Sequence, residues 1–235
     1  MKIKLVTIVG SPIKGGNCEI YTMEALKAVE NDPDVESDIF LLSNWKTPKG
    51  CNHCNYCATK QKPDRFCAIQ DELTEIYPKV LEADAILLST PAYACRLTGQ
   101  MACFMDRLRG LYHGSLYKGS LANKVASVLT VAFGRHAGVE TTMLSVIQGL
   151  LMWEVLPVTL GLWGPYGSGG LTSYGGEGKV KPDDYDAILK DQFAVKESRI
   201  LCKKLVDTAK VIKAGNEALN IENRYIKMYR EAVGS

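Results

Sequence analysis

The sequence has no strong net charge, no long hydrophobic run, and no internal repeat or low-complexity tract. Its 28 lysines and arginines nearly balance its 26 aspartates and glutamates, which leaves a formal charge of +2. This balance gives no reason to expect nucleic acid or an anionic membrane as a partner. No stretch approaches the roughly 20 apolar residues that span a bilayer, so a membrane location is not expected either.

A secretion signal is also missing from the N-terminal segment. Lys2 and Lys4 precede a short apolar run, but this run ends at once in the Gly-Ser-Pro of residues 10–12 and is too short for a signal peptide. We therefore expect a cytoplasmic protein, in which thiols stay reduced. Eight cysteines in such a chain suggest a metal or redox role before a disulfide framework.

Strand and helix patterns alternate along the chain. Compact β-branched runs predict buried strands, and apolar residues at 3.6-residue spacing predict helices between them. This alternation predicts an α/β fold with a flavodoxin-like, doubly wound, five-stranded parallel sheet of order 2-1-3-4-5, which binds ligands outside the carboxyl ends of its strands. The predicted strands are 3–9, 35–42, 85–89, 124–132 and a run near 154–160; the predicted helices are 20–31, 71–81 (short or kinked because of Pro78), 99–109 and 139–151.

Two segments do not fit the alternation of strands and helices. Residues 43–70 form a long cysteine-rich loop, and a loop of this length usually has a function. Residues 161–180, rich in glycine and aromatics, are expected to form an ordered surface loop. We assign 1–180 to the α/β domain and 181–235 to a helical extension that packs on the domain or on a partner subunit. The apolar stripe of this extension consists of Ile188, Phe193, Ile200, Leu201, Leu205 and Val206.

The loop of residues 10–18 joins the first strand to the first helix. Backbone N–H groups and the positive end of the helix dipole point at an anion bound there. Ser11 and Asn17 add side-chain donors, and Lys14 adds a charge. The loop has neither the Walker ending nor the Gly-x-Gly-x-x-Gly fingerprint. The alternative is a plain strand–helix turn with a good cap.

The same loop resembles the Gly-Ser-Pro-Arg-x-x-x-Asn-Thr signature of the NADPH-dependent FMN reductase and iron–sulfur flavoprotein group. Lys14 replaces the arginine, and Cys18 replaces the threonine. The resemblance continues through residues 83–93, 98–107 and 134–140. It implies that the FMN phosphate is held by Ser11, Pro12, Lys14, Gly16, Asn17 and Cys18.

The resemblance also implies a place for the flavin ring. Tyr93 would stack on the isoalloxazine or hydrogen-bond to it; without the resemblance, Tyr93 is equally a surface aromatic and His136 a solvated loop residue. Cys95 lies in the same loop, where packing is the preferred role, while Cys103 and Cys202 are expected in the core. The implied ring contacts are Pro91, Ala92, Tyr93 and Ala94, with Phe133, Gly134, Arg135, His136 and Gly138 at the pyrimidine edge.

Cys51, Cys54 and Cys57 follow one another as C-x2-C-x2-C, and Cys67 comes after nine further residues. Three cysteines at successive i+3 steps can converge on one [4Fe–4S] cubane, with the fourth ligand supplied from elsewhere. Structural zinc more often takes two separated C-x2-C pairs. Zinc, and cysteines without metal, remain alternatives.

The cysteine pattern resembles that of the iron–sulfur flavoproteins of anaerobic archaea and bacteria. The last gap is wider in this chain, so Cys67 is the least regular of the implied cluster ligands. The residues that follow it nevertheless match the C-x-I-x-D-D pattern of the family, since 67–72 read Cys-Ala-Ile-Gln-Asp-Glu. An insertion before a retained ligand is the simpler interpretation.

FMN exchanges electrons singly or in pairs, whereas a [4Fe–4S] centre passes one at a time. Together they predict an electron-transfer flavoprotein that takes electrons from a ferredoxin-like donor through the cluster to FMN, and then to a small-molecule acceptor. The resemblance implies a homodimer or homotetramer in which one subunit's cluster faces another's flavin. The alternatives are an NAD(P)H-dependent FMN or quinone reductase whose cysteines bind no cluster, and a zinc-stapled binding module.

Overall fold

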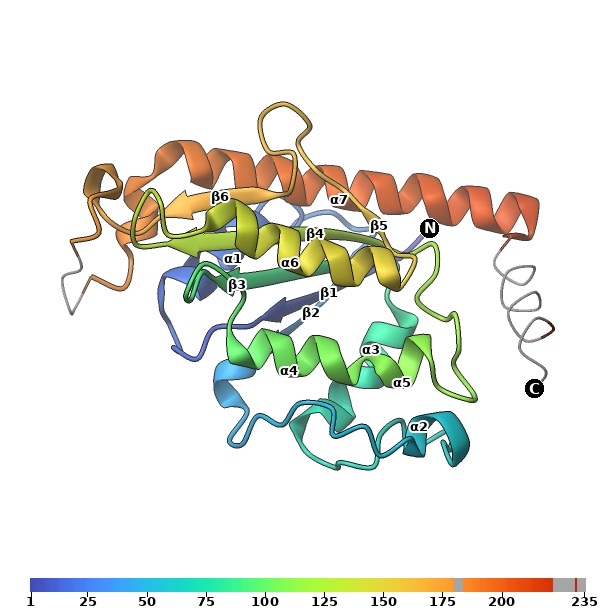
Figure 1. Ribbon diagram of the computed structural model, residues 1–235. Helices are drawn as coiled ribbons and strands as arrows, with labels where there is room; N and C mark the ends of the chain where they lie inside the picture. The colour runs from blue at the N-terminus through green and yellow to red at the C-terminus, as the bar shows by residue number, and fades with distance from the viewer. Residues whose placement is uncertain (180–183, 222–230, 232–235) are drawn as a thin grey trace.

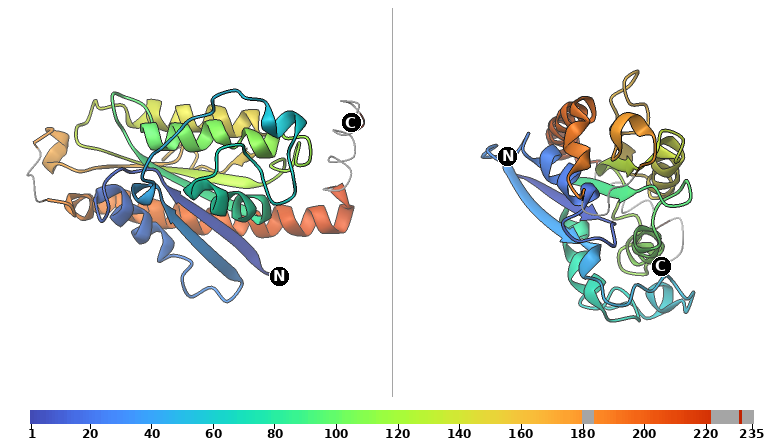
Figure 2. Two further views of the ribbon diagram at one scale, coloured as in Figure 1. Left: turned by 90° about the horizontal axis from the view of Figure 1, so that it is seen from below. Right: turned by 90° about the vertical axis from the view of Figure 1, so that its left-hand side faces the viewer.

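The computed structural model describes residues 1–179, 184–221 and 231. Its centre is a parallel sheet covered by helices on both faces, as Figures 1 and 2 show. The strand order β2-β1-β3-β4-β5 confirms the predicted flavodoxin-like topology. The strands are β1 (Ile3–Val9), β2 (Val35–Leu41), β3 (Ala85–Pro91), β4 (Val125–Ala132), β5 (Leu156–Pro157) and β6 (Ser168–Leu171).

The edge of the sheet next to β4 differs from the prediction. The strand expected near 154–160 is reduced to the two residues of β5, which pair with the start of β4, and β6 pairs with the end of β4. The two short strands therefore share one edge position. Residues 161–180 were predicted as a loop throughout, which is wrong for β6. The apolar signal is missing there because Gly169 and Gly170 face Val139 and Ile188 too closely for side chains of their own.

Two groups of helices cover the two faces of the sheet. One face carries α1 and the long helix α7, and the other carries α3, α4 and α6. The left view of Figure 2 shows α4 and α6 on the opposite side of the sheet from α7. The helices are α1 (Asn17–Leu26), α2 (Tyr56–Thr59), α3 (Ile76–Glu82), α4 (Gly99–Arg107), α5 (Arg109–Tyr112), α6 (Val139–Met152) and α7 (Gln192–Leu219).

The C-terminal helix packs on the sheet through part of its predicted stripe. Leu201, Leu205 and Val206 are fully buried, but Phe193 and Ile200 are 62% and 50% exposed. The latter two were assigned wrongly to the packed face, because a 28-residue helix presents only one side to a flat sheet. Ile188 is buried as predicted, although it lies in a short 3-10 turn before the helix. Residues 181–183, where the extension was expected to begin, and residues 222–230 and 232–235 lie outside the described residues.

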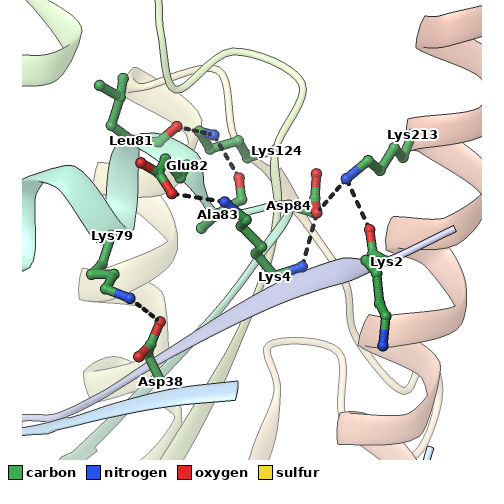
Figure 3. Close-up of polar contacts among 10 residues, drawn as sticks. All are labelled: Lys2, Lys4, Asp38, Lys79, Leu81, Glu82, Ala83, Asp84, Lys124 and Lys213. Atoms are coloured by element: carbon green, nitrogen blue, oxygen red, sulfur yellow. Dashed lines mark hydrogen bonds and ion pairs between the residues drawn. The ribbon is translucent and has the colours of Figure 1, made fainter. Parts of the chain in front are cut away.

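A polar cluster attaches α7 to the amino-terminal edge of the sheet (Figure 3). Nζ of Lys213 donates to Oδ2 of Asp84 and to the carbonyl of Lys2, each at 2.9 Å. The same Asp84 oxygen accepts the backbone N–H of Lys4 at 2.9 Å. This cluster lies at the edge opposite to the carboxyl ends of the strands, so the other edge is free to carry a site.

Among the described residues, we find no helix that combines the length and the apolar character needed to cross a membrane.

Candidate functional site

The loops that follow β1, β3 and β4 meet at the carboxyl edge of the sheet. The N–H of Gly10 donates to Ser89 at 2.7 Å, and the N–H of Ala92 donates to Val131 at 2.9 Å. Thr98, the N-cap of α4, donates its hydroxyl to the carbonyl of Gly10. The structure thus brings the predicted segments 10–18, 91–95 and 133–138 together at the edge where this topology places ligands.

The loop before α1 leaves backbone donors for an anion. No side chain caps the helix at Gly16, and the first N–H groups of a helix have no intrahelical acceptor. Gly15 has a φ of +68° with open space where a Cβ would stand. Its N–H donates to Oε2 of Glu19 at 2.8 Å, so a carboxylate already occupies one donor. A phosphate bound here would compete with Glu19 for that N–H.

The side chains predicted to hold phosphate separate into two groups. Lys14 is exposed and forms no ion pair with a described residue, and the buried Ser11 hydroxyl accepts the N–H of Ile13 at 3.1 Å. Asn17 instead accepts the N–H of Ile188 at 2.7 Å through Oδ1 and so holds the segment before α7. The structure therefore keeps Lys14 and Ser11 at the loop and turns the Asn17 side chain away.

Cys18 also points away from the loop. Its side chain is 2% exposed, and its Sγ lies 3.2 Å from Oγ of Ser89 on β3. Burial raises the pKa of this thiol to about 12, so it stays protonated at neutral pH. At this position the chain supplies a backbone N–H to the loop and a small apolar group to the core.

The segment predicted to line the flavin ring is a tight turn. The N–H of Tyr93 donates to Arg96 at 2.8 Å, and the two central residues, Ala94 and Cys95, both have positive φ. Pro91 and Ala92 are buried before the turn, whereas Tyr93 and Ala94 are exposed. Partial burial of the Tyr93 side chain raises the pKa of its phenol, so the hydroxyl can donate a hydrogen bond at neutral pH.

The third loop packs directly against this turn. A Cβ on Gly138, whose φ is +85°, would lie 2.4 Å from Cα of Cys95, so only glycine permits this approach. The hydroxyl of Thr141 donates to the carbonyl of Cys95 at 2.7 Å. Around Gly138 the predicted residues divide by burial: Gly134 is buried, and Phe133, Arg135 and His136 are exposed.

One further segment reaches this edge without having been predicted. The N–H of Arg135 donates to Gly176 at 3.0 Å, and its guanidinium donates to Gly175 at 2.8 Å. The Ser173 hydroxyl donates to the carbonyl of Phe133. Residues 173–178 thus form a rim beside the third loop. The paired glycines at 175–176 mark a turn in the sequence, but nothing there indicates which loop the turn contacts.

The four predicted metal-binding cysteines line one hollow beside α4 and α5. Cys51, Cys54, Cys57 and Cys67 share it with Arg107, Arg109 and Gly110. In the part of the chain that the structure describes, no three His, Cys, Asp or Glu side chains stand close enough to hold a single metal ion. A cubane is larger than one ion and takes its thiolates from its separate corners. Four thiols around one hollow are the number of ligands that either a cubane or a tetrahedral zinc ion takes.

The inserted residues between Cys57 and Cys67 are well anchored. The buried Gln61 side chain donates to Gly110 at 2.6 Å and accepts the N–H of Leu116 at 3.0 Å. Phe66 stacks between two tyrosines, with ring centroids 5.4 Å from Tyr77 and 4.7 Å from Tyr117. Both ends of the insertion are thereby held next to α5, including Cys57, whose carbonyl accepts the N–H of Ser115 at 2.8 Å.

Two arginines of the hollow were not predicted as site residues. The fully buried Arg107 pairs with both carboxylate oxygens of Asp71, and its Nε has no partner among the described residues. Arg109 donates from Nη2 to Oδ1 of Asn55 at 2.9 Å, while its Nη1 is buried and likewise unpartnered. Buried donors of this kind need an acceptor. A thiolate-bound cluster, which is anionic and accepts hydrogen bonds at sulfur, would supply it.

The cysteine hollow and the predicted flavin edge lie near opposite ends of α4. Thr98 begins the helix beside Gly10, and Arg107 ends it at the hollow. With a rise of 1.5 Å per residue, these two positions are about 14 Å apart along the axis. The two predicted sites of one chain are therefore separated by the length of this helix.

Comparison with known proteins finds relatives that match nearly the whole chain. An iron–sulfur flavoprotein of Methanocaldococcus jannaschii is 32% identical over 213 residues, which are 90% of this chain and 100% of that protein. An iron–sulfur flavoprotein of Archaeoglobus fulgidus is 28% identical and covers 90% of this chain and 98% of its own. The solved NAD(P)H:quinone oxidoreductase from Methanothermobacter marburgensis shares the fold, with a TM-score of 0.54 and 15% identity over 87% of this chain and 100% of that one.

The model of the family described as NADPH-dependent FMN reductase matches residues 3–162, which include the three loops at the carboxyl edge and the four cysteines of the hollow. The chain belongs to the NADPH-dependent FMN reductase family and is an FMN-dependent oxidoreductase.

Proposed function

We propose that this protein is an electron-transfer flavoprotein that passes electrons between a [4Fe–4S] cluster and FMN. Cys51, Cys54, Cys57 and Cys67 would ligate the cluster, which a ferredoxin-like donor reduces. FMN would bind at the carboxyl edge and pass electrons to a small-molecule acceptor. The cofactors supply the one- and two-electron chemistry, and the protein sets their positions and potentials.

The cysteine hollow carries this proposal. Four thiols from one loop converge there, and two guanidinium groups present buried, unpartnered donors among the described residues. Arg107 Nε and Arg109 Nη1 have no partner among the described residues, and an anionic cluster in the hollow would accept hydrogen bonds from both. The relatives named iron–sulfur flavoproteins support the same interpretation.

For the flavin, the proposed ligands are those at the carboxyl edge. The N–H groups of residues 15–18, with Lys14 and Ser11, would hold the phosphate. The turn at 91–94 would lie along the ring, and Phe133, Gly134, Arg135, His136 and Gly138 would lie at its pyrimidine edge. Because Asn17 and Cys18 use their side chains elsewhere, we expect them to contribute backbone N–H groups.

The resemblance to the iron–sulfur flavoproteins implies a homo-oligomer in which one subunit's cluster faces a neighbour's flavin. The two proposed sites of one chain are about 14 Å apart along α4. We therefore propose a homodimer or homotetramer, and a reducing compartment such as the cytoplasm, in which the cysteine thiols remain available to iron.

Anaerobic purification tests the proposal. The protein should show flavin absorption with a broad iron–sulfur shoulder, and about four irons per chain. Cys54→Ala should lose iron and sulfide but keep FMN, whereas the control Cys103→Ala, outside the hollow, should keep both. An iron-free protein that still oxidises NADPH would contradict the proposed electron-transfer function.

The family supports one competing function, an NAD(P)H-dependent FMN or quinone reductase. It predicts that NAD(P)H bleaches the flavin directly under anaerobic conditions, at a rate that Cys54→Ala leaves unchanged. The zinc-stapled module predicts one zinc per chain and no yellow colour.

A further inference from the structure

The carboxylate of Glu19 lies at the loop that is proposed to hold the flavin phosphate. Glu19 is the acidic residue in the first turn of α1, and its Oε2 accepts the N–H of Gly15 at 2.8 Å. Glu24, on the same helix, forms ion pairs with Lys27 and Arg199. Glu19 forms none with a described residue, so its charge is stabilised by this N–H group and by the positive end of the helix dipole.

The hydrogen bond from Gly15 occupies a donor that the phosphate site needs. The side chains of Asn17 and Cys18 bond elsewhere in the fold, and no side chain caps the helix at Gly16. The donors that remain for an anion are therefore mostly backbone N–H groups. One of them, that of Gly15, already binds a carboxylate.

This contact differs from ordinary capping of a helix. Gly16 is the N-cap of α1, so Glu19 stands at the third helical position, where a glutamate commonly accepts the N–H of the N-cap residue itself. Here the carboxylate reaches one residue further, to Gly15 in the loop. Glu19 thus places a negative charge inside the loop, where an anionic ligand would bind.

The carboxylate and a phosphate would exclude each other at this N–H. Both are anions that accept hydrogen bonds, and like charges repel strongly when they are a few ångströms apart. The bond between Glu19 and Gly15 is exposed, and the place of a Cβ on Gly15 has no other atom within 4 Å. The half-buried Glu19 side chain can therefore rotate into water and leave the N–H to another anion.

We propose that Glu19 is an internal competitor of the flavin phosphate. Its carboxylate holds the N–H of Gly15 in the empty loop, moves into water when FMN binds, and so weakens FMN binding and speeds FMN release. The flavin would then exchange with FMN in solution. This inference rests on the proposed function, because it requires the phosphate of FMN at this loop. Riboflavin has no phosphate, so Glu19 should not affect its binding.

Three full-length variants test the role of Glu19, each purified anaerobically with its cofactors. Glu19→Gln removes the charge but keeps an oxygen that can accept the same N–H, and Glu19→Ala removes both. The control Glu30→Gln makes the same change in charge at an exposed position beyond the other end of α1. Release of FMN from the holoprotein is followed with excess apoflavodoxin, which traps free FMN. Fluorescence titration of the flavin-depleted proteins gives the affinities for FMN and riboflavin.

The two Glu19 variants should hold FMN more firmly than the parent. Glu19→Gln should release FMN about tenfold more slowly and bind it about tenfold more tightly, because the bound phosphate no longer lies near a displaced carboxylate. Glu19→Ala should change both quantities in the same direction and at least as far. In both variants the affinity for riboflavin should stay within about twofold of the parent, and Glu30→Gln should match the parent for both flavins, since its charge is remote and screened.

Equal FMN release rates and affinities in the parent and both Glu19 variants, with FMN bound in all, overturn the competitor role alone. Tighter binding of FMN and riboflavin by the same factor, or weaker binding of FMN, would show that Glu19 shapes the loop and would also overturn this role. A parent protein that takes up no FMN overturns the proposed function and the inference with it.

Discussion

Nζ of Lys213 on α7 lies 2.9 Å from Oδ2 of Asp84, and this oxygen also accepts the backbone N–H of Lys4 at 2.9 Å. One carboxylate thus joins the C-terminal helix to the sheet. Asp84→Ala should lower the free energy of unfolding by about 1–3 kcal/mol, because it removes the acceptor of both donors. Urea denaturation of the flavin-loaded protein measures this change.

The matched control for this change is Asp207→Ala. Asp207 pairs with Lys203 within the exposed side of α7, and such surface pairs contribute less than about 1 kcal/mol. Equal losses in the two variants would show that the link between helix and sheet does not depend on Asp84.

Substitutions of Lys14 and Cys18 should have different effects: the first on the affinity for FMN, the second on the stability of the fold. Lys14→Ala should weaken FMN binding about fivefold, equivalent to about 1 kcal/mol, because an exposed charge leaves the phosphate loop. Cys18→Ala should leave the affinity within about twofold but lower stability by about 1 kcal/mol, because the buried thiol packs on Ser89. Flavin fluorescence titration and urea denaturation give the two readouts. A large affinity loss in Cys18→Ala alone would place the thiol at the phosphate.

Arg109 should set the potential of the proposed cluster. Its Nη1 is buried in the hollow without a partner among the described residues. Removing this charge in Arg109→Met destabilises the more negative reduced state, so the reduction potential should fall by roughly 60 mV, a tenfold change for one electron. An anaerobic titration followed by electron paramagnetic resonance measures the shift.

Arg65→Met is the control for this experiment. It removes the same charge from an exposed position outside the hollow, where Arg65 lies over the Tyr56 ring. Water and salt screen that charge, and the potential should move by less than half as much. Identical shifts in both variants would show that only overall charge matters.

Glu197 should make stability fall as pH rises. Burial raises the pKa of this carboxyl above its unfolded value of 4.5, and its Oε1 has no partner among the described residues. A group with a raised folded pKa contributes stability that is complete below 4.5 and is lost as pH rises through the folded pKa. Glu197→Gln should therefore be more stable than the parent at pH 7.

Urea titrations at several pH values check this expectation. The advantage of Glu197→Gln should shrink as pH falls toward 4.5. Because Glu24 is held by Lys27 and Arg199, its pKa is lowered, so its contribution is lost at low pH in both proteins and cancels in the comparison. A stability difference that is constant with pH would show that Glu197 is not buried in its charged form.

Local patterns in the sequence were sufficient for most of the fold. The apolar runs that become β1, β3 and β4 are buried along their whole length after the first residues. Such runs can be recognised as buried strands from the local sequence alone, without knowing which segments pack against them. The loop at 10–18 is likewise readable, because glycines between a strand and a helix create an anion site from backbone alone. Strand order and the carboxyl-edge site followed from these elements.

Contacts between distant segments decided the rest. Residues 168–171 become a strand only because β4 offers an unpaired edge. The Asn17 side chain is held away from the phosphate loop because it accepts the N–H of Ile188, 171 positions later. Arg109 enters the cysteine hollow because α4 and α5 lie alongside the loop. The sequence by itself, with the family resemblance, predicted which residues would bind FMN and a cluster. The tertiary structure decided which side chains face those sites, because side-chain direction depends on packing partners far away in the chain.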